Sequence, residues 1–236
     1  MNIDVIFSAN EVTKDRVEGK IVVVIDVLRA TSVMLTAMKN GTKEIRPFKE
    51  IDKLISYTKG LKGVLRCGER KGTKIDGFDL GNSPLEYQQE IVCGKVICLT
   101  TSNGTNALVN SSYGKKILIG SYLNLDALCK KIDEIGEDLV VVCAGTDGEF
   151  SLDDSLCAGE IIKRLEYKSL SDSARAMYMI ASAPGTLKDK LKETKHYNFL
   201  KKLGEIKDLE ICFSIDSQNI VLEYRDGVIK ECDLLH

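Results

Sequence analysis

The sequence predicts an α/β fold with three layers, α/β/α, in which helices cover both faces of a mainly parallel or mixed β-sheet. Short runs rich in Val, Ile and Leu alternate with segments of helical periodicity. Most of the connections are short, which favours β-α-β units, and the last segments favour a C-terminal β-hairpin at or near the sheet edge. The 236 residues, 44% of them hydrophobic, are enough to bury a full core, so we expect a single domain over residues 1–236.

The expected strands are short, apolar and rich in β-branched residues. Before the tail they cover residues 4–7, 21–27, 44–48, 63–67, 95–100, 116–119 and 139–143. The run at 21–27 has the clearest pattern, because a continuous apolar run is typical of a strand that is buried on both faces.

The expected helices carry apolar residues three or four positions apart. They cover residues 31–39, 51–58, 84–90, 105–110, 125–135, 152–165, 171–182 and 187–203. Ser83, Pro84 and Glu86 have the spacing of a capping box with proline in the first turn, so we interpret Ser83 as a helix cap.

The tail has a different pattern and predicts three further strands, at residues 209–215, 220–224 and 228–233. Arg225-Asp226-Gly227 joins the last two and is typical of a hairpin turn. We expect these strands to extend the sheet, antiparallel, at its edge, where the hairpin could also pair two chains into a homo-oligomer.

Composition excludes several classes of partner. The 33 basic and 35 acidic residues create no overall positive field for nucleic acid. No apolar run reaches the roughly 18 residues of a membrane span, and Met-Asn-Ile-Asp at the start lacks the basic residues of a signal peptide. We therefore expect a cytoplasmic protein that binds neither nucleic acid nor membranes.

The cysteines and histidines do not form a metal-binding pattern. The 8 cysteines include no Cys-x-x-Cys pair, and most lie in apolar segments, which favours free thiols in a reducing compartment. The 2 histidines are His196, in a lysine-rich helical stretch, and His236, the last residue. A zinc site is therefore not expected.

Chemistry is predicted in the run from Ile21 to Thr31, where an apolar strand ends in the carboxylate of Asp26 and the guanidinium of Arg29. A buried carboxylate needs a cation, a metal ion or backbone N–H donors as a partner. The carboxyl end of a parallel strand is also where open α/β sheets bind ligands. Asp26 and Arg29, followed by Thr31 at the start of the next helix, therefore mark a candidate site.

Two other junctions between a strand and a helix have a similar composition. Residues 99–105 and 143–151 bring small, hydroxyl and glycine residues to a helix N-terminus, where backbone N–H groups can hold a phosphate, sulfonate or carboxylate. The candidate binding residues there are Thr101, Ser102, Asn103, Gly104, Thr105 and Gly145. The same residues also serve as ordinary helix caps, so the structural interpretation stays open.

The longest polar segment, residues 68–84, predicts a wall or lid of the same site. It contributes Glu69 and Arg70 directly after a strand, and Asn82. Carboxylates gathered from several strand ends suit a hard cation, so Asp26, Glu69 and Asp154 are the expected Mg²⁺ ligands. Asp154 has a structural alternative, because acidic residues are also stabilised in a first helical turn.

These motifs together resemble the 2-phosphosulfolactate phosphatase family of coenzyme M biosynthesis, over nearly the whole chain and less distinctly after residue 171. The matching stretches are Asp26-Val-Leu-Arg-Ala-Thr31, Gly68-Glu-Arg70, Gly77-Phe-Asp79-Leu-Gly-Asn-Ser-Pro84, Thr100-Thr-Ser-Asn-Gly-Thr105 and Cys143-Ala-Gly145 with Ser151-Leu-Asp-Asp154. The resemblance implies an α/β/α phosphatase that depends on Mg²⁺ and hydrolyses 2-phospho-3-sulfolactate, a small anionic phosphorylated hydroxy acid, to 3-sulfolactate and phosphate.

The predicted mechanism follows from the charge of such a substrate. Phosphoryl transfer needs mainly charge neutralisation and in-line positioning, and Arg29, Arg70, the turn at 102–105 and Lys71 or Lys74 can supply the positive charge. The expected catalytic residues are Asp26, Arg29, Glu69, Arg70 and Asp154. Asp26 either attacks phosphorus or activates water; a haloacid-dehalogenase-type site would need a second Asp where Leu28 stands.

Two alternatives belong to other functional classes. Cys143 follows a strand and precedes Gly145, so it could be the nucleophile of a cysteine hydrolase, although a buried residue at the end of an apolar strand explains it better. A non-catalytic anion-binding protein would use the same loops but would need no cluster of carboxylates, because carboxylates weaken anion binding unless a cation intervenes.

Overall fold

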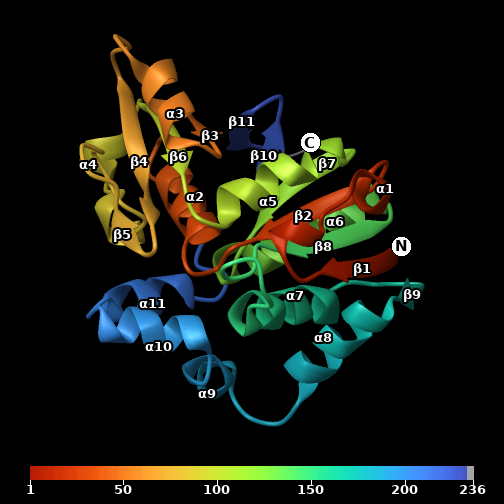
Figure 1. Cartoon of the computed structure of the whole chain (residues 1–236). Coiled ribbons are helices and arrows are strands. Elements are labelled where there is room, and N and C mark those ends of the chain that lie inside the picture. The colour runs from red at the N-terminus through yellow and green to blue at the C-terminus, as the bar shows by residue number, and fades with distance from the viewer. Residues whose placement is uncertain (233–236) are drawn as a thin grey trace.

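The computed structural model describes residues 1–232 and contains an 11-stranded sheet with the order β5-β4-β6-β3-β11-β10-β7-β2-β8-β1-β9. Helices lie on both sides of this sheet (Figure 1). The predicted α/β class with a mixed sheet is therefore confirmed. The strands are β1 (Asn2–Ile6), β2 (Ile21–Ile25), β3 (Glu44–Pro47), β4 (Val64–Arg70), β5 (Thr73–Lys74), β6 (Val96–Thr100), β7 (Lys116–Gly120), β8 (Leu139–Cys143), β9 (Ser169–Leu170), β10 (Leu222–Arg225) and β11 (Val228–Glu231).

The helices agree with the sequence periodicity over most of the chain. They are α1 (Lys14–Val17), α2 (Ala30–Lys39), α3 (Ile51–Thr58), α4 (Gln89–Val92), α5 (Gly104–Asn110), α6 (Leu125–Ile135), α7 (Leu152–Arg164), α8 (Asp172–Ser182), α9 (Leu187–Lys192), α10 (Lys195–Lys202) and α11 (Ile206–Cys212). No helix in residues 1–232 is long and apolar enough to cross a membrane.

The centre of the sheet is buried from both sides. β2 pairs in parallel with β7 and β8, and all of its residues are buried. Val22 and Val24 join an apolar cluster with residues of α2 and α5, whereas Val23 and Ile25 join a second cluster with residues of α6 and α7. This alternation explains why the sequence shows a continuous apolar run there instead of one apolar face.

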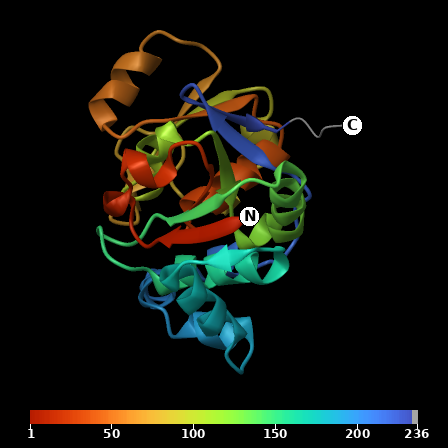
Figure 2. The same cartoon turned by 90° about the vertical axis from the view of Figure 1, so that its right-hand side faces the viewer.

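The hairpin forms as predicted but lies inside the sheet. β10 and β11 are antiparallel, and Asp226 and Gly227 both have positive φ, as a tight two-residue turn requires. β10 pairs with β7 and β11 pairs with β3. The hairpin therefore lies between two groups of parallel strands, with β4, β6 and β3 on one side and β7, β2, β8 and β1 on the other (Figures 1 and 2). The predicted edge position is therefore wrong. Without the hairpin, β3 and β7 would each leave backbone N–H and C=O groups unpaired on one side, and β11 and β10 supply the missing partners. The predicted continuation to residue 233 reaches beyond the described residues.

The predicted strand at 209–215 is wrong, because residues 209–212 belong to helix α11 and residues 213–215 are in neither a helix nor a strand. Apolar and polar residues alternate from Leu209 to Ile211, which imitates a strand. The buried residues are Asp208, Leu209 and Cys212, a helical spacing that places one face against the rest of the protein.

Two other predicted helices and one predicted helix cap also differ in the structure. The expected helix at 187–203 is divided into α9 and α10, because Thr194 caps α10 by accepting a hydrogen bond from the N–H of Tyr197 (3.2 Å). The expected helix at 84–90 is a 3-10 turn, Pro84–Glu86, followed by α4. Ser83 does not cap it; its hydroxyl instead donates to Asp208 Oδ1 (2.7 Å).

Candidate functional site

A cavity of about 310 Å³ lies at the carboxyl ends of β2, β4, β6 and β8, next to helix α10. α10 and α11 lie below the lower ends of β4 and β5 (Figure 1), so they close this side of the sheet. The side chains that line the cavity come from loops after these strands and from α10. They are Asp26, Leu28, Arg29, Glu69, Lys71, Gly72, Asn82, Ser102, Asn103, Thr146, Asp147, Lys195, His196, Phe199 and Leu200.

Asp26 lies directly after β2 with a carboxylate that is 7% exposed and lines the cavity. Its Oδ1 accepts the N–H of Ala30 (3.2 Å), the first residue of α2. Burial raises the pKa of Asp26 to about 7; the negative charges of Glu69 and Asp153 act in the same direction, and the Ala30 N–H opposes them. A carboxyl group that titrates near neutral pH in a cavity is a candidate for proton transfer or nucleophilic attack.

The start of helix α5 fits against Asp26 only because residue 104 is glycine. A Cβ at Gly104 would lie 2.6 Å from Asp26 Oδ2 and 2.7 Å from the Cβ of Ala30. Both distances are shorter than real Cβ contacts, so any larger residue would displace the carboxylate. Gly104 therefore shapes the site through its missing side chain.

Glu69 lines the same cavity and is fixed by the turn that was predicted to hold an anion. Its Oε1 accepts the N–H of Ser102 (2.8 Å), and its Oε2 accepts the N–H of Gly72 (2.7 Å) and the hydroxyl of Ser102 (3.3 Å). Glu69 lies within β4 and not after it, because β4 continues to Arg70 and pairs with β5. The anion held by Ser102 is therefore a carboxylate of the protein.

The predicted hydroxyl ligands are divided between the cavity and local capping. Thr101 and Thr105 exchange hydrogen bonds, from the Thr105 N–H to Thr101 Oγ1 (3.1 Å) and from the Thr101 N–H to Thr105 Oγ1 (3.2 Å). Thr31 Oγ1 donates to the carbonyl of Asp26 (2.8 Å). All three threonines are buried and stabilise helix starts, whereas Ser102 and Asn103 line the cavity.

Arg29 lines the cavity, but its guanidinium is already paired. It is 3% exposed, and its Nη1 forms ion pairs with Asp208 and Glu205, at the start of α11 and just before it. Nη2 lies 3.4 Å from the carbonyl oxygen of Gly72. Arg29 thus ties the loop after β2 to α11, a role that the sequence did not indicate.

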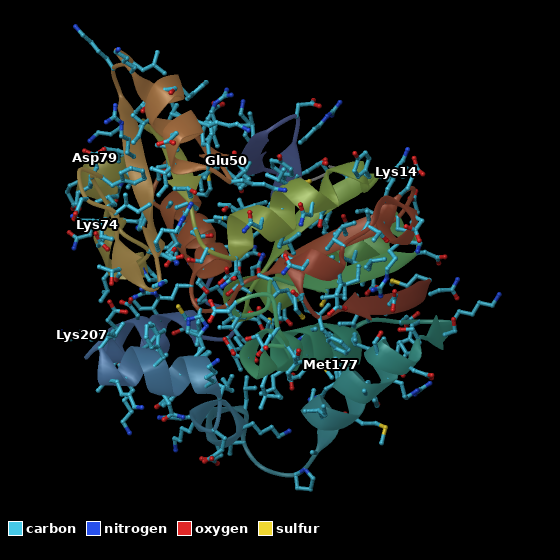
Figure 3. All side chains as sticks on the ribbon, viewed as in Figure 1. Lys14, Glu50, Lys74, Asp79, Met177 and Lys207 are labelled. Carbon is cyan, nitrogen blue, oxygen red and sulfur yellow. The ribbon has the colours of Figure 1, made fainter. Side chains whose placement is uncertain are left out.

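Arg70 does not line the cavity. Its guanidinium donates to the carbonyls of Glu69 (2.7 Å) and Lys49 (3.1 Å) and to Thr100 Oγ1 (2.8 Å). These contacts hold the end of β4 against β6. Lys74, another predicted cation, is exposed and lies at the outer side of the molecule near β5 (Figure 3).

Asp154 joins two strand ends and stands apart from the cavity wall. Its Oδ1 accepts the N–H of Val27 (2.9 Å) and its Oδ2 accepts the N–H of Gly145 (3.2 Å). Burial raises the pKa of Asp154 well above its usual range, and the charges of Asp153 and Asp26 raise it further. Both oxygens and the Gly145 N–H are therefore occupied by contacts between the loops after β2 and β8.

The donor set for a metal is smaller than the predicted group of three carboxylates. Within residues 1–232, no group of three or more His, Cys, Asp or Glu side chains is arranged to hold a metal ion. Asp26 and Glu69 both line the cavity, as does Asn82, whose buried Oδ1 accepts no hydrogen bond from the described part of the chain. This all-oxygen set fits a cation that completes its coordination with water and substrate, as Mg²⁺ commonly does.

Cys143 is fully buried and belongs to the apolar cluster that contains Val141 and Leu156. Burial raises the pKa of the Cys143 thiol well above its usual range, and the charge of Asp154 acts in the same direction. The thiolate needed for nucleophilic attack is thereby disfavoured. The structure therefore argues against the cysteine hydrolase.

The chain is similar to a known protein family and to several named proteins. The family model described as 2-phosphosulpholactate phosphatase matches residues 6–227. This chain belongs to that family. Proteins named probable 2-phosphosulfolactate phosphatase are similar to it over their full length: 43% identity for Clostridium tetani (98% of this chain, 100% of the relative), 41% for Clostridium beijerinckii (97% and 99%) and 44% for Clostridium perfringens strain SM101 (98% and 96%). The predicted family resemblance is thus confirmed.

Several residues at the site of this family member were missed by sequence reasoning. His196 and Lys195 of α10 line the cavity, and Asp153, Asp208 and Glu205 hold other residues there. The scarcity of histidine was the available signal for His196, since the chain has only 2. For Asp208 no signal exists, because it lies in none of the motifs and directly precedes the segment 209–215 that was interpreted as a strand.

Proposed function

We propose that this protein is a phosphatase that hydrolyses 2-phospho-3-sulfolactate to 3-sulfolactate and phosphate, a step toward coenzyme M. The observation that carries the proposal is the cavity at the strand ends, which is lined by Asp26 and Glu69 together with Lys71, Lys195 and His196. A substrate with phosphate, sulfonate and carboxylate groups needs several positive charges, and carboxylates beside an anion suit catalysis with a cation better than binding alone. The names of the full-length relatives support the choice of substrate.

We propose Mg²⁺ as the cofactor, with Asp26, Glu69 and the Oδ1 of Asn82 as its protein ligands. When bound, it would neutralise negative charge on the phosphoryl oxygens. The fixed orientation of Glu69, which accepts hydrogen bonds from Ser102 and Gly72, supports this assignment, because a positioned carboxylate needs no rearrangement on binding. Asp154 is not included, because its carboxylate bridges the loops after β2 and β8 and is not among the side chains that line the cavity.

Other roles in the proposed reaction, charge neutralisation and activation of the nucleophile, fall to side chains that line the cavity. Lys71 and Lys195 meet the charge of the substrate from opposite elements, the β4–β5 turn and α10. Asp26 either attacks phosphorus itself or removes a proton from the attacking water, because its carboxylate lines the cavity that would hold the phosphoryl group. Rapid quenching with labelled substrate separates the two routes, because only direct attack leaves an acyl-phosphate on the protein.

The decisive experiment measures phosphate release by the purified full chain from small phosphorylated 2-hydroxy acids. We expect the highest kcat/KM for 2-phospho-3-sulfolactate, loss of activity with a chelator and recovery with Mg²⁺. Asp26→Asn should reduce kcat by about 1000-fold or more. Asp76→Asn, a change of the same kind at an exposed residue of the 68–84 segment, should leave activity unchanged.

Two outcomes would contradict the proposal. Activity that persists in chelator would remove the metal from it. Tight binding of the phosphate ester without turnover, undiminished in Asp26→Asn, would favour the non-catalytic anion-binding protein.

A further inference from the structure

We propose that His196 is the general acid that protonates the leaving oxygen of the substrate, and that Asp153 is a positioning residue that orients its imidazole. This inference rests on the proposed phosphatase function. Two neighbouring groups carry it: His196, the one histidine in residues 1–232, and the buried Oδ2 of Asp153, which accepts no hydrogen bond from those residues.

The geometry joins these two groups. Asp153, on the first turn of α7, is 2% exposed, and its Oδ1 accepts the hydroxyl of Ser151 (2.6 Å). Its other oxygen, Oδ2, accepts no hydrogen bond from residues 1–232 and lies 3.8 Å from Nδ1 of His196. A buried carboxylate oxygen without a hydrogen bond is costly, because it has lost water without gaining a partner. When the imidazole of His196 is protonated, its positive charge offsets the negative charge of this oxygen.

The orientation of the ring follows. With Nδ1 directed at Asp153, the other nitrogen, Nε2, is left for the cavity that His196 lines together with Asp26 and Glu69. A carboxylate behind one nitrogen of a histidine fixes its tautomer and stabilises its protonated form. The ring is 21% exposed, so it can exchange its proton with water between turnovers.

The charges around His196 act in both directions. Burial lowers its pKa, and Arg29 also lowers it, whereas Asp153, Glu69 and Asp147 raise it. Lys71 and Lys195 line the same cavity and favour the neutral ring. A bound phosphoryl group adds negative charge next to Nε2, so we expect imidazolium to form when substrate binds.

The chemistry requires such a group. The leaving group of a phosphorylated 2-hydroxy acid is an alkoxide, which leaves slowly unless it is protonated. As the bond from phosphorus to the ester oxygen breaks, its electron pair goes to that oxygen, which takes the proton from Nε2 and leaves as the hydroxyl of the product. The new bond to phosphorus comes from water or Asp26, and the neutral imidazole regains a proton from solvent.

The test compares substrates whose leaving groups differ in acidity. For His196→Gln with 2-phospho-3-sulfolactate, we expect kcat to fall by about 100- to 1000-fold. For acetyl phosphate, whose leaving acetate needs no proton, the fall should be less than about 10-fold, because the acid step contributes little there. Lys201→Gln, an exposed change on the same helix, should change neither rate, and thermal unfolding of each variant checks the fold. Equal losses of His196→Gln on both substrates would refute the general acid.

A second measurement does not depend on turnover. The chain has only 2 histidines, so the imidazole NMR signal that disappears in His196→Gln identifies His196. We expect inorganic phosphate to raise its pKa, and Asp153→Asn to lower the pKa and move the basic limb of the kcat profile to lower pH. An unchanged His196 titration in Asp153→Asn would refute the positioning role. If the wild type released no phosphate from 2-phospho-3-sulfolactate, the proposed function would fail, while the response to phosphate would still show whether His196 faces the anion.

Discussion

The ion pairs of Arg29 with Asp208 and Glu205 lead to the most quantitative prediction. Asp208 is 2% and Arg29 3% exposed, whereas Glu205 is 31% exposed. Removing one partner from a buried pair costs about 3–5 kcal/mol, because a charge stays buried without compensation. Glu205 would still offset part of the Arg29 charge, so we expect Asp208→Asn to lower the free energy of unfolding by about 3 kcal/mol, the lower end of that range.

The matched comparison is Glu205→Gln, which removes the more exposed carboxylate and keeps Asp208. A partly exposed partner contributes less, so this change should cost about 1 kcal/mol or less. Urea unfolding measures both, and thermal unfolding should show Asp208→Asn melting roughly 6–12 °C below the wild type, given 2–4 °C per kcal/mol in a chain of this size. If the two substitutions cost the same, the burial of Asp208 is not what makes the pair important.

Three further predictions concern the site. Gly104→Ala should lower kcat at least 10-fold and cost about 1–3 kcal/mol of stability, because its Cβ would overlap Asp26 and Ala30; full activity would contradict the tight fit. Burial raises the pKa of Asp26 from about 4 in the unfolded chain to about 7 in the folded protein. The linked stabilisation, on the order of 4 kcal/mol, is therefore present below about pH 4 and is lost as pH rises to about 7. Wild-type stability should therefore fall relative to Asp26→Asn between pH 4 and pH 7, and parallel curves would refute the raised pKa. Cys143→Ser should keep most of the phosphatase activity, and its inactivity with an unchanged melting temperature would revive the cysteine mechanism.

The sequence predicts the central strands well because their burial leaves a local pattern. β2 and β8 are continuous apolar runs, and each is buried along its whole length. The hairpin turn at Asp226 and Gly227 is equally local, since those residues tolerate the positive φ of a tight turn. Its position in the middle of the sheet depends on the pairing of β10 with β7 and of β11 with β3, which no local pattern reports.

Within the site, the sequence predicted which residues come together better than what each one does. Strand ends bring Asp26 and Glu69 to one cavity, as expected from the topology of α/β sheets. The partners that redirect Arg29 and Asp154 lie far away in sequence: Asp208 is 179 positions from Arg29, and Val27 is 127 positions from Asp154. Such contacts depend on how α11 and α7 pack and leave no trace in the spacing of the motifs.

The cavity is lined by loops that follow the strands and by helix α10, and these two groups of residues lie far apart in the sequence. The motifs shared with the family supply the carboxylates, and the N–H groups of the turn at 102–105 are partly used by Glu69. The positive charge at the cavity comes from Lys71 of the β4–β5 turn and from α10, which supplies Lys195 and, once substrate binds, the imidazolium of His196. Because α10 also contacts the loops through Phe199, next to Gly72, this helix is where we expect substrate choice to be decided. Exchanging Lys195 or Phe199 should therefore change KM among phosphorylated hydroxy acids more than it changes kcat, the reverse of the effect expected for Asp26.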